Sequence, residues 1–299
     1  MNTGSSQPCC AITGAAGYLG SAIAGYFSDR GWSVVEFARR KGTPAPGRIS
    51  VSFDLESAID PEIFRRNSVR AFVHCAYDFR PVRWQDIERI NVQGSIRVLQ
   101  AAKQAGVERL VFISSISAFE GCSSLYGKAK LAIERAAAEV GACIVRPGLI
   151  YGHTRPGGMF GALQNSVTRS RMIPLIGSGE YPQYLVHVDD LCELIYKFVC
   201  GEFACPSAPL VAASGRPWPM RDLLRALAAA QQKTLRLVPV PWQLIWLPLK
   251  MLEVLRVAAP FRSDSVISLV RQNPTPDFSA ALQTGCRFRD FAPDPPRPS

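Results

Sequence analysis

One short segment of the chain combines two residue types that can perform acid–base chemistry. The segment from Tyr126 to Lys130 reads Y-G-K-A-K. Residues four apart share a face of a helix, so Tyr126 and Lys130 are expected to lie side by side. A lysine ammonium stabilises a neighbouring phenolate. Tyr126 could then give a proton to a carbonyl oxygen, or take one from an alcohol, while hydride moves.

A glycine-rich turn near the N-terminus gives this pair a partner for hydride transfer. Residues 13–20 read T-G-A-A-G-Y-L-G, after a strand-like run and before a helical pattern. In that context Gly14 permits a tight turn, Gly17 allows close backbone approach and Gly20 lets the helix pack on the strand. The N–H groups of the helix start then face a pyrophosphate. The expected dinucleotide contacts are Gly14, Gly17, Tyr18, Leu19 and Gly20.

The segment after the second expected strand indicates which dinucleotide binds. A carboxylate about 20 residues beyond the glycines would hold the ribose 2′-hydroxyl of NAD. Residues 37–41 instead read F-A-R-R-K, with Ala38 in that position. Arginine pairs with phosphate through two parallel hydrogen bonds, so Arg39 predicts NADP as the cofactor, with NAD less favoured. A solvated basic loop is the alternative. Arg80 and Arg83, before the helix expected at Trp84, are separate candidates to meet an anionic group of the substrate.

An alternation of strands and helices in the first half must position both motifs. Such an alternation is typical of βαβ units in a parallel sheet. Helices are expected to begin near Gly17, Pro61, Trp84 and Leu125, and Ile90 to Gly106 has helical periodicity. We therefore predict an α/β fold with a doubly wound parallel sheet of Rossmann type. The expected strands are Cys9–Thr13, Ser33–Phe37, Ile49–Phe53, Ala71–Cys75, Arg109–Ser114 and Ala142–Arg146.

The pattern changes after Arg146. Proline and glycine become frequent, and short apolar segments alternate with loops. We predict a dinucleotide-binding Rossmann domain over residues 8–150 and a smaller substrate-binding lobe, interleaved with it, over residues 151–291. The proline-rich residues 292–299 are expected to form a disordered tail.

Composition limits the classes of protein that fit. The chain has 299 residues, 47% of them hydrophobic and 19% charged, which is typical of a globular protein. Met1 to Pro8 is polar and uncharged, unlike a signal peptide, so we expect a cytoplasmic protein. The net charge of +10 comes from dispersed basic residues without a nucleic-acid-binding motif. We expect no nucleic-acid partner; the positive field favours phosphorylated cofactors or anionic substrates.

Cysteines and histidines do not suggest a metal site. The nine cysteines form no C-x-x-C pair, and most lie in apolar segments, as reduced core cysteines do. His74 and His187 lie in apolar, strand-like contexts, where structural histidines are the better interpretation. We therefore predict no bound metal.

One segment near the C-terminus is strongly apolar. Trp242 to Val257 carries only Lys250, Glu253 and Arg256 as charged residues. We expect a helix that packs on the smaller lobe. A helix lying on a membrane surface is the alternative.

The order of these motifs resembles the extended short-chain dehydrogenase/reductase family, whose members carry T-G-x-x-G-x-x-G and Y-x-x-x-K. The resemblance covers roughly residues 9–200. The further matching segments, in family order, are Asp54-Leu55, Val73 to Ala76, Asn91 with Gly94, Ser114-Ser115, Arg146 to Gly148 with Tyr151-Gly152, and His187 to Asp190.

The resemblance implies a role for each matched residue. Tyr126 is the acid and base, assisted by Lys130, and Ser115 orients the substrate oxygen. Ser117 is the alternative serine, because the loop from Ile116 to Gly121 permits a shifted alignment. Family members often dimerise through the Tyr–Lys helix, so a homodimer is implied. The implied cofactor contacts beyond the glycine turn are Arg39, Asp54, Leu55, Cys75, Ala76, Asn91, Lys130 and Pro147.

Three functions stay open on the sequence alone. The first is an NAD(P)-dependent oxidoreductase or epimerase acting on a carbonyl or alcohol centre of a nucleotide sugar. The second is an NADP-dependent reductase or dehydrogenase of a lipid, steroid-like or other hydrophobic carbonyl. Gln183, where nucleotide-sugar members carry an arginine, weakens the first. The third is a non-catalytic dinucleotide-binding sensor or assembly subunit. The intact Tyr126 and Lys130 argue against this third function, because a sensor does not need an acid–base pair.

Overall fold

The computed structural model describes residues 7–40, 46–152, 157–255, 257 and 261–293. Residues 294–299, most of the expected tail, lie outside the described residues. The chain divides into two compact units that alternate along the sequence. The first unit comprises residues 1–115, 129–146 and 191–210, and the second comprises residues 116–128, 147–190 and 211–299.

A seven-stranded sheet dominates the first unit. Its strand order is β11-β6-β5-β4-β1-β2-β3, and the pairs from β6 across to β3 are parallel. The strand order reverses between β1 and β4, as in doubly wound sheets. The predicted Rossmann-type α/β fold is therefore confirmed. The strands are β1 (Cys9–Thr13), β2 (Ser33–Ala38), β3 (Arg48–Ser52), β4 (Val69–His74), β5 (Arg109–Ile113), β6 (Cys143–Pro147) and β11 (Leu210–Ala212).

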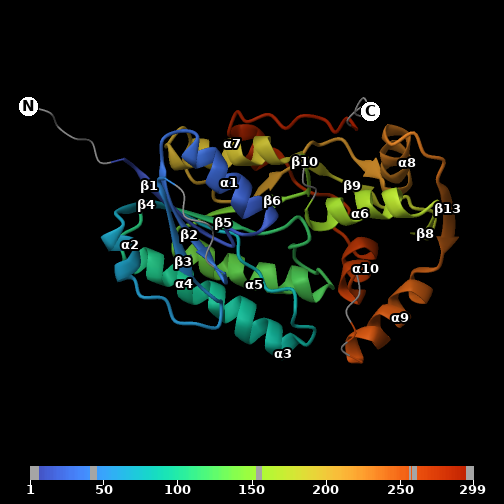
Figure 1. Ribbon diagram of the computed structural model, residues 1–299, viewed down its shortest axis with the longest axis horizontal. Coiled ribbons are helices and arrows are strands. Elements are labelled where there is room, and N and C mark those ends of the chain that lie inside the picture. Colours follow the sequence, from blue (N-terminus) through green and yellow to red (C-terminus); the bar gives the residue numbers. More distant parts are fainter. Residues whose placement is uncertain (1–6, 41–45, 153–156, 256, 258–260, 294–299) are drawn as a thin grey trace, which may run out of the picture. The chain divides into compact units, whose positions relative to one another are not determined.

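Helices cover both faces of this sheet, with α1 and α7 on one face and α4 and α5 on the other (Figure 1). Because both faces are covered, β1 is buried along its whole length and reads as a continuous apolar run. The helices are α1 (Tyr18–Ser28), α2 (Glu62–Arg66), α3 (Trp84–Ile87), α4 (Gln93–Gln104), α5 (Leu125–Glu139) and α7 (Val188–Val199), with a π-helical stretch η1 (Glu88–Val92) between α3 and α4.

The second unit has its own hydrophobic core, built from short strands and helices. Phe160 of α6, Leu175 of β8 and Leu223 of α8 are buried together there. Strand β13 pairs in parallel with β8, and β10 with β7. Its elements are β7 (Leu149–Tyr151), α6 (Gly158–Arg169), β8 (Met172–Ile176), β9 (Pro182–Gln183), β10 (Leu185–His187), β12 (Trp218–Pro219), α8 (Met220–Ala230), β13 (Arg236–Val240), α9 (Trp242–Val254), α10 (Ser263–Val270) and α11 (Ser279–Gln283).

Candidate functional site

The glycine turn joins β1 to α1 in a geometry that excludes side chains. Gly14 has φ +69°, and a Cβ there would lie 3.0 Å from the backbone nitrogen of Ala76. A Cβ on Gly20 would lie 2.2 Å from the carbonyl oxygen of Gly14. Gly17 is the N-cap of α1 and offers no side-chain acceptor, and the first turn carries no acidic residue. This helix start, with Tyr18 and Leu19, fits the phosphates of a dinucleotide.

A buried hydrogen-bond network ties the turn to β4. The hydroxyl of Thr13 lies 2.6 Å from Nδ1 of His74. The same hydroxyl oxygen accepts hydrogen bonds from the backbone N–H groups of Cys75 and Ala76, at 3.1 and 3.3 Å. Burial lowers the pKa of His74 to about 3, and the charge of Lys130 acts in the same direction. His74 is therefore neutral and structural, and the Cys75-Ala76 backbone is held against Gly14.

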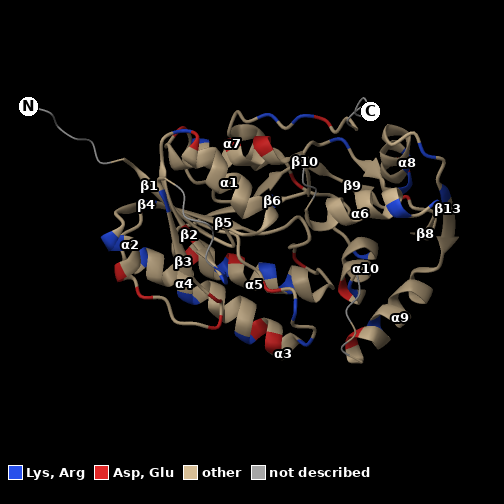
Figure 2. Cartoon of the chain, viewed as in Figure 1, with Lys and Arg blue, Asp and Glu red and all other residues tan. Residues whose placement is uncertain are grey.

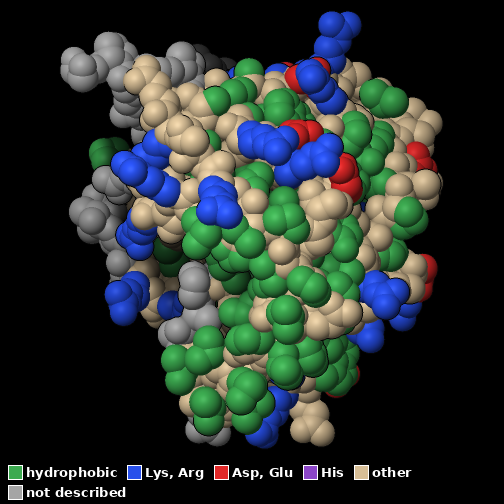
Figure 3. Space-filling view, turned by 90° about the vertical axis from the view of Figure 1, so that its right-hand side faces the viewer, with side chains coloured by type: hydrophobic (Ala, Val, Ile, Leu, Met, Phe, Trp, Pro, Cys, Tyr) green, Lys and Arg blue, Asp and Glu red, His purple; other side chains and the backbone are tan. Residues whose placement is uncertain are grey.

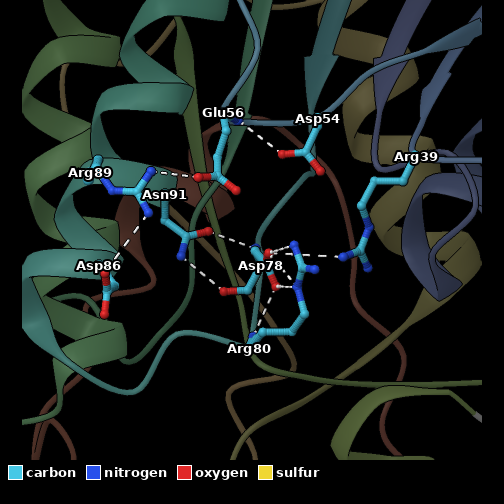
Figure 4. Close-up of polar contacts among 8 residues, drawn as sticks. All are labelled: Arg39, Asp54, Glu56, Asp78, Arg80, Asp86, Arg89 and Asn91. Carbon is cyan, nitrogen blue, oxygen red and sulfur yellow. Dashed lines mark hydrogen bonds and ion pairs between the residues drawn. The ribbon is translucent and has the colours of Figure 1, made fainter.

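Arg39 and Arg80 share one buried carboxylate, that of Asp78 (Figure 4). Arg80 donates hydrogen bonds to both Asp78 oxygens, including one of 2.8 Å, while Arg39 Nη1 lies 3.9 Å from Asp78 Oδ2. Burial opposes ionisation of Asp78, but the hydrogen bonds and charge of Arg80, helped by Arg39, lower the pKa of this carboxyl. Both guanidinium groups stay more than half exposed. Arg80 is held by Asp78, whereas the longer contact of Arg39 leaves its guanidinium able to turn toward an anion.

Asn91 and the segment after β3 form the rest of this end of the sheet. Asn91 is buried; it accepts the Asp78 N–H at 2.6 Å and donates to the Asp78 carbonyl at 2.9 Å. Asp54 accepts the N–H of Glu56 at 3.0 Å, which turns the chain after β3. A Cβ on Gly94 would lie 2.4 Å from the Leu55 carbonyl, so this glycine lets α4 approach Leu55.

Lys130 is buried in the first unit, with 3% of its surface exposed. Its ammonium donates to the carbonyl of Ile113 at the end of β5 at 2.7 Å. Burial lowers the pKa of Lys130 to about 8, although Cys75 and Glu134 act in the opposite direction. The ammonium form therefore still predominates at neutral pH.

The serines after β5 differ in their partners. Ser114 is tied to Glu134 by a 2.5 Å hydrogen bond, and Glu134 in turn accepts two from Arg146. Ser115 follows at the strand end and is half-buried. Ser117, in the second unit, accepts a hydrogen bond from Ser268 at 2.9 Å.

The first turn of α5 carries Tyr126 and is capped by a residue far along the chain. Asp264 of α10 accepts the N–H groups of Leu125 and Tyr126 at 2.7 and 2.9 Å. A Cβ on Gly127 would lie 2.4 Å from the Ser117 carbonyl, so the loop with Ser117 lies directly against this turn. In the same unit, the Pro147 carbonyl accepts the N–H of Ile116 at 3.0 Å.

The predicted residues thus fall into two groups. The first unit brings together the glycine turn, Cys75-Ala76, Arg39 and Asn91, and it contains Asp54, Leu55, Ser115 and Lys130. The second unit contains Ser117, Tyr126 and Pro147. Helix α5 continues from Tyr126 to Lys130, which confirms their spacing of one helical turn.

Three acidic residues in these networks were missed on the sequence alone: Asp78, Glu134 and Asp264. Asp78 lies four residues beyond β4, and an acid just past a parallel strand is a signal that was available. Asp264 had no comparable signal, because it lies 138 residues from Tyr126.

Comparison with known proteins gives a consistent family and fold. The family model described as the NAD dependent epimerase/dehydratase family matches residues 10–200. The chain is 29% identical over 195 residues to a protein named ceramide reductase from Caulobacter vibrioides, covering 63% of this chain. The chain spans 60% of that reductase and 46% to 62% of the length of the next curated relatives it matches.

Two solved structures share the fold. One is a UDP-glucose 4-epimerase from Thermotoga maritima with UDP-glucose, at a TM-score of 0.64 and 20% identity, covering 78% of this chain and 86% of that one. The other is a UDP-glucuronic acid 4-epimerase from Bacillus cereus with a UDP-sugar analogue and NAD. Its TM-score is 0.66 at 16% identity, covering 92% and 97% of the two chains.

Proposed function

The chain belongs to the NAD dependent epimerase/dehydratase family, and we propose that it is an NAD(P)-dependent enzyme acting at a carbonyl or alcohol centre with Tyr126 as acid and base. The single observation that carries the proposal is the Tyr126–Lys130 pair on α5, in a chain whose glycine turn fits a dinucleotide. A bound dinucleotide supplies or takes up the hydride.

Each residue has a definite task in this proposal. Lys130, fixed by the Ile113 carbonyl, provides the positive charge that favours the phenolate of Tyr126. Tyr126 gives its proton to the carbonyl oxygen during reduction and takes it back during oxidation. Ser115 or Ser117 holds the same oxygen by a hydrogen bond; Ser114 is already tied to Glu134.

For the cofactor, we propose NADP over NAD. Arg39 directly follows β2, and the carboxylate nearest to it, Asp78, is already neutralised by Arg80. The exposed guanidinium of Arg39 is thus available for a 2′-phosphate. NAD is the cofactor named with the Bacillus cereus epimerase, and it is the alternative here.

Two substrate classes are supported by different observations. A nucleotide sugar is supported by the fold shared with two UDP-sugar epimerases. A hydrophobic carbonyl is supported by the ceramide reductase relative and by Gln183, whose amide donates to the neighbouring Pro182 carbonyl at 2.9 Å and carries no charge for a diphosphate.

The test is NADPH and NADH oxidation measured with two substrate panels, UDP-keto-sugars and hydrophobic ketones such as 3-keto-lipids. The proposal predicts turnover with one panel, and the panel that reacts assigns the substrate class. Tight dinucleotide binding with neither dinucleotide oxidation in either panel nor epimerisation of a UDP-sugar would contradict it and favour the non-catalytic sensor or assembly subunit.

A further inference from the structure

Helix α9 carries an apolar face that is exposed among the residues the structure describes. None of its thirteen residues is buried. Leu244, Leu247, Met251 and Val254 recur at helical spacing and are 53% to 73% exposed. Figure 3 shows hydrophobic side chains gathered over the lower part of this face of the molecule, where α9 lies in Figure 1. The expected packing on the lobe is seen in the contact of α9 with α10.

The single acidic residue of α9 is withdrawn from this face. Glu253 is 11% exposed and accepts hydrogen bonds from the backbone N–H and hydroxyl of Ser263 at 2.9 and 2.8 Å. Lys250 and Arg262 approach its carboxylate at 3.5 and 3.9 Å. The negative charge is therefore compensated between α9 and α10.

The acid of α10 is engaged as well, since Asp264 caps α5. What the α9–α10 pair presents outward is therefore apolar and cationic: Lys250 is 42% exposed, and Arg271 at the end of α10 is exposed. Figure 2 shows α9 without charged residues along most of its length, with charge only toward its C-terminal end.

We propose that α9 docks on the surface of an anionic lipid bilayer. An apolar helix face with cationic side chains and no exposed acid matches the acyl boundary and the headgroup charge of such a surface. If a second copy of the chain covered α9, the two Lys250 side chains and the net charge of +10 on each chain would repel one another, which is unfavourable. Among the described residues, no helix is long and apolar enough to cross a membrane. The helix would lie in the plane of the interface, along about 20 Å.

The docking surface is physically connected to the turn that carries Tyr126. Glu253 of α9 binds Ser263, and the next residue, Asp264, holds the N–H of Tyr126. A hydrophobic substrate could therefore leave the bilayer next to the α9–α10 pair, close to the turn that carries Tyr126. The docking itself does not depend on the reaction, and its test uses no turnover.

Sedimentation with vesicles tests the proposal on the full chain. The probe is vesicles of phosphatidylcholine and phosphatidylglycerol in equal amounts, with phosphatidylcholine alone as reference. The triple variant Leu244→Glu, Leu247→Glu, Met251→Glu should bind at least tenfold less to the anionic vesicles. The matched control is Leu282→Glu, because Leu282 of α11 is an apolar side chain of the same unit and is 73% exposed. The Leu282→Glu variant should bind like the wild type. Added salt should weaken the binding of the wild type to the anionic vesicles.

A measurement on the wild type covers the case in which the triple variant misfolds. Hydrogen exchange of residues 242–255 should slow when anionic vesicles are added. The proposal is wrong if the wild type stays in the supernatant, if the triple variant sediments equally, or if exchange is unchanged. It is also wrong if light scattering finds a lipid-free dimer that the triple variant dissociates, since a second copy would then cover α9.

Discussion

At the scale of single residues, Arg39 has a buried carboxylate within reach. Its Nη1 lies 3.9 Å from Asp78, whose pKa is already lowered by Arg80. If Arg39 turns toward a phosphate, it gives up only this long contact with Asp78, and Arg80 keeps Asp78 neutralised.

The first prediction concerns Arg39→Ala. We expect a rise of at least tenfold in the Kd for NADPH and little change for NADH, because a charge-assisted bidentate contact to the 2′-phosphate is lost. Calorimetric titration measures both constants. Arg40→Ala, the adjacent exposed arginine, is the matched control and should leave both unchanged. Equal losses for the two dinucleotides would show that Arg39 does not select between them.

At the scale of elements, the sequence predicts the sheet well. The five expected strands from Cys9–Thr13 to Arg109–Ser114 agree with β1 to β5 within two residues, because buried parallel strands read as apolar runs. Helix α4 ends where Gly106 was expected to end it, and that glycine has φ +82°. The helix expected near Trp84 is present, but the π-helical stretch η1 that joins it to α4 was not anticipated, because such a stretch leaves no simple periodicity.

Long-range polar contacts account for most of what sequence reasoning missed. Asp264 caps a helix that begins 139 residues earlier, and no local pattern marks such a pair. The residue types of the site could be read from spacing, whereas their hydrogen-bond partners depend on which loops the fold brings together.

The second prediction compares two glycines of α1. Gly20→Ala should lower dinucleotide affinity at least tenfold and the free energy of unfolding by about 1–3 kcal/mol, because its Cβ would meet the Gly14 carbonyl at 2.2 Å. In Gly25→Ala the nearest atom is a flexible arginine terminus at 3.9 Å. That control should bind normally and gain up to about 1 kcal/mol from helix propensity. Isothermal titration and urea unfolding distinguish them; normal cofactor binding by Gly20→Ala would refute the assigned role.

The third prediction tests the cap on α5. Asp264→Ala removes both hydrogen bonds to the Tyr126 turn and should cost about 0.5–2 kcal/mol of stability. We expect kcat to fall while the Kd of the dinucleotide stays constant. Asp277→Ala removes a similar contact, to the N–H of Ser279 at the start of α11, and should leave kcat unchanged. Equal kcat in the two variants would exclude a positioning role for Asp264.

At the scale of the whole molecule, His74 makes stability depend on pH. Its pKa is about 3 in the folded chain against an ordinary value of 6.5, because the imidazole is buried. As the pH falls from 6.5 toward 3, the unfolded chain takes up a proton that the folded chain does not, so the free energy of unfolding decreases. Above pH 6.5 this contribution is constant.

The fourth prediction follows from this titration. In His74→Gln the decrease in unfolding free energy between pH 7 and pH 5 should be smaller than in the wild type, because glutamine does not titrate. Urea unfolding at the two pH values measures the difference. Identical pH dependence in the two proteins would mean that His74 is not buried as a neutral base.

The central claim is that Tyr126 is the acid and base of a hydride transfer, and Tyr126→Phe tests it most directly. With whichever keto substrate the wild type reduces, stopped-flow measurement of NADPH oxidation in a single turnover isolates the chemical step. We predict a loss of roughly a hundredfold to ten-thousandfold in that rate, with the Kd of the dinucleotide unchanged. A Tyr126→Phe variant that oxidises NADPH at the wild-type rate would contradict the proposed function.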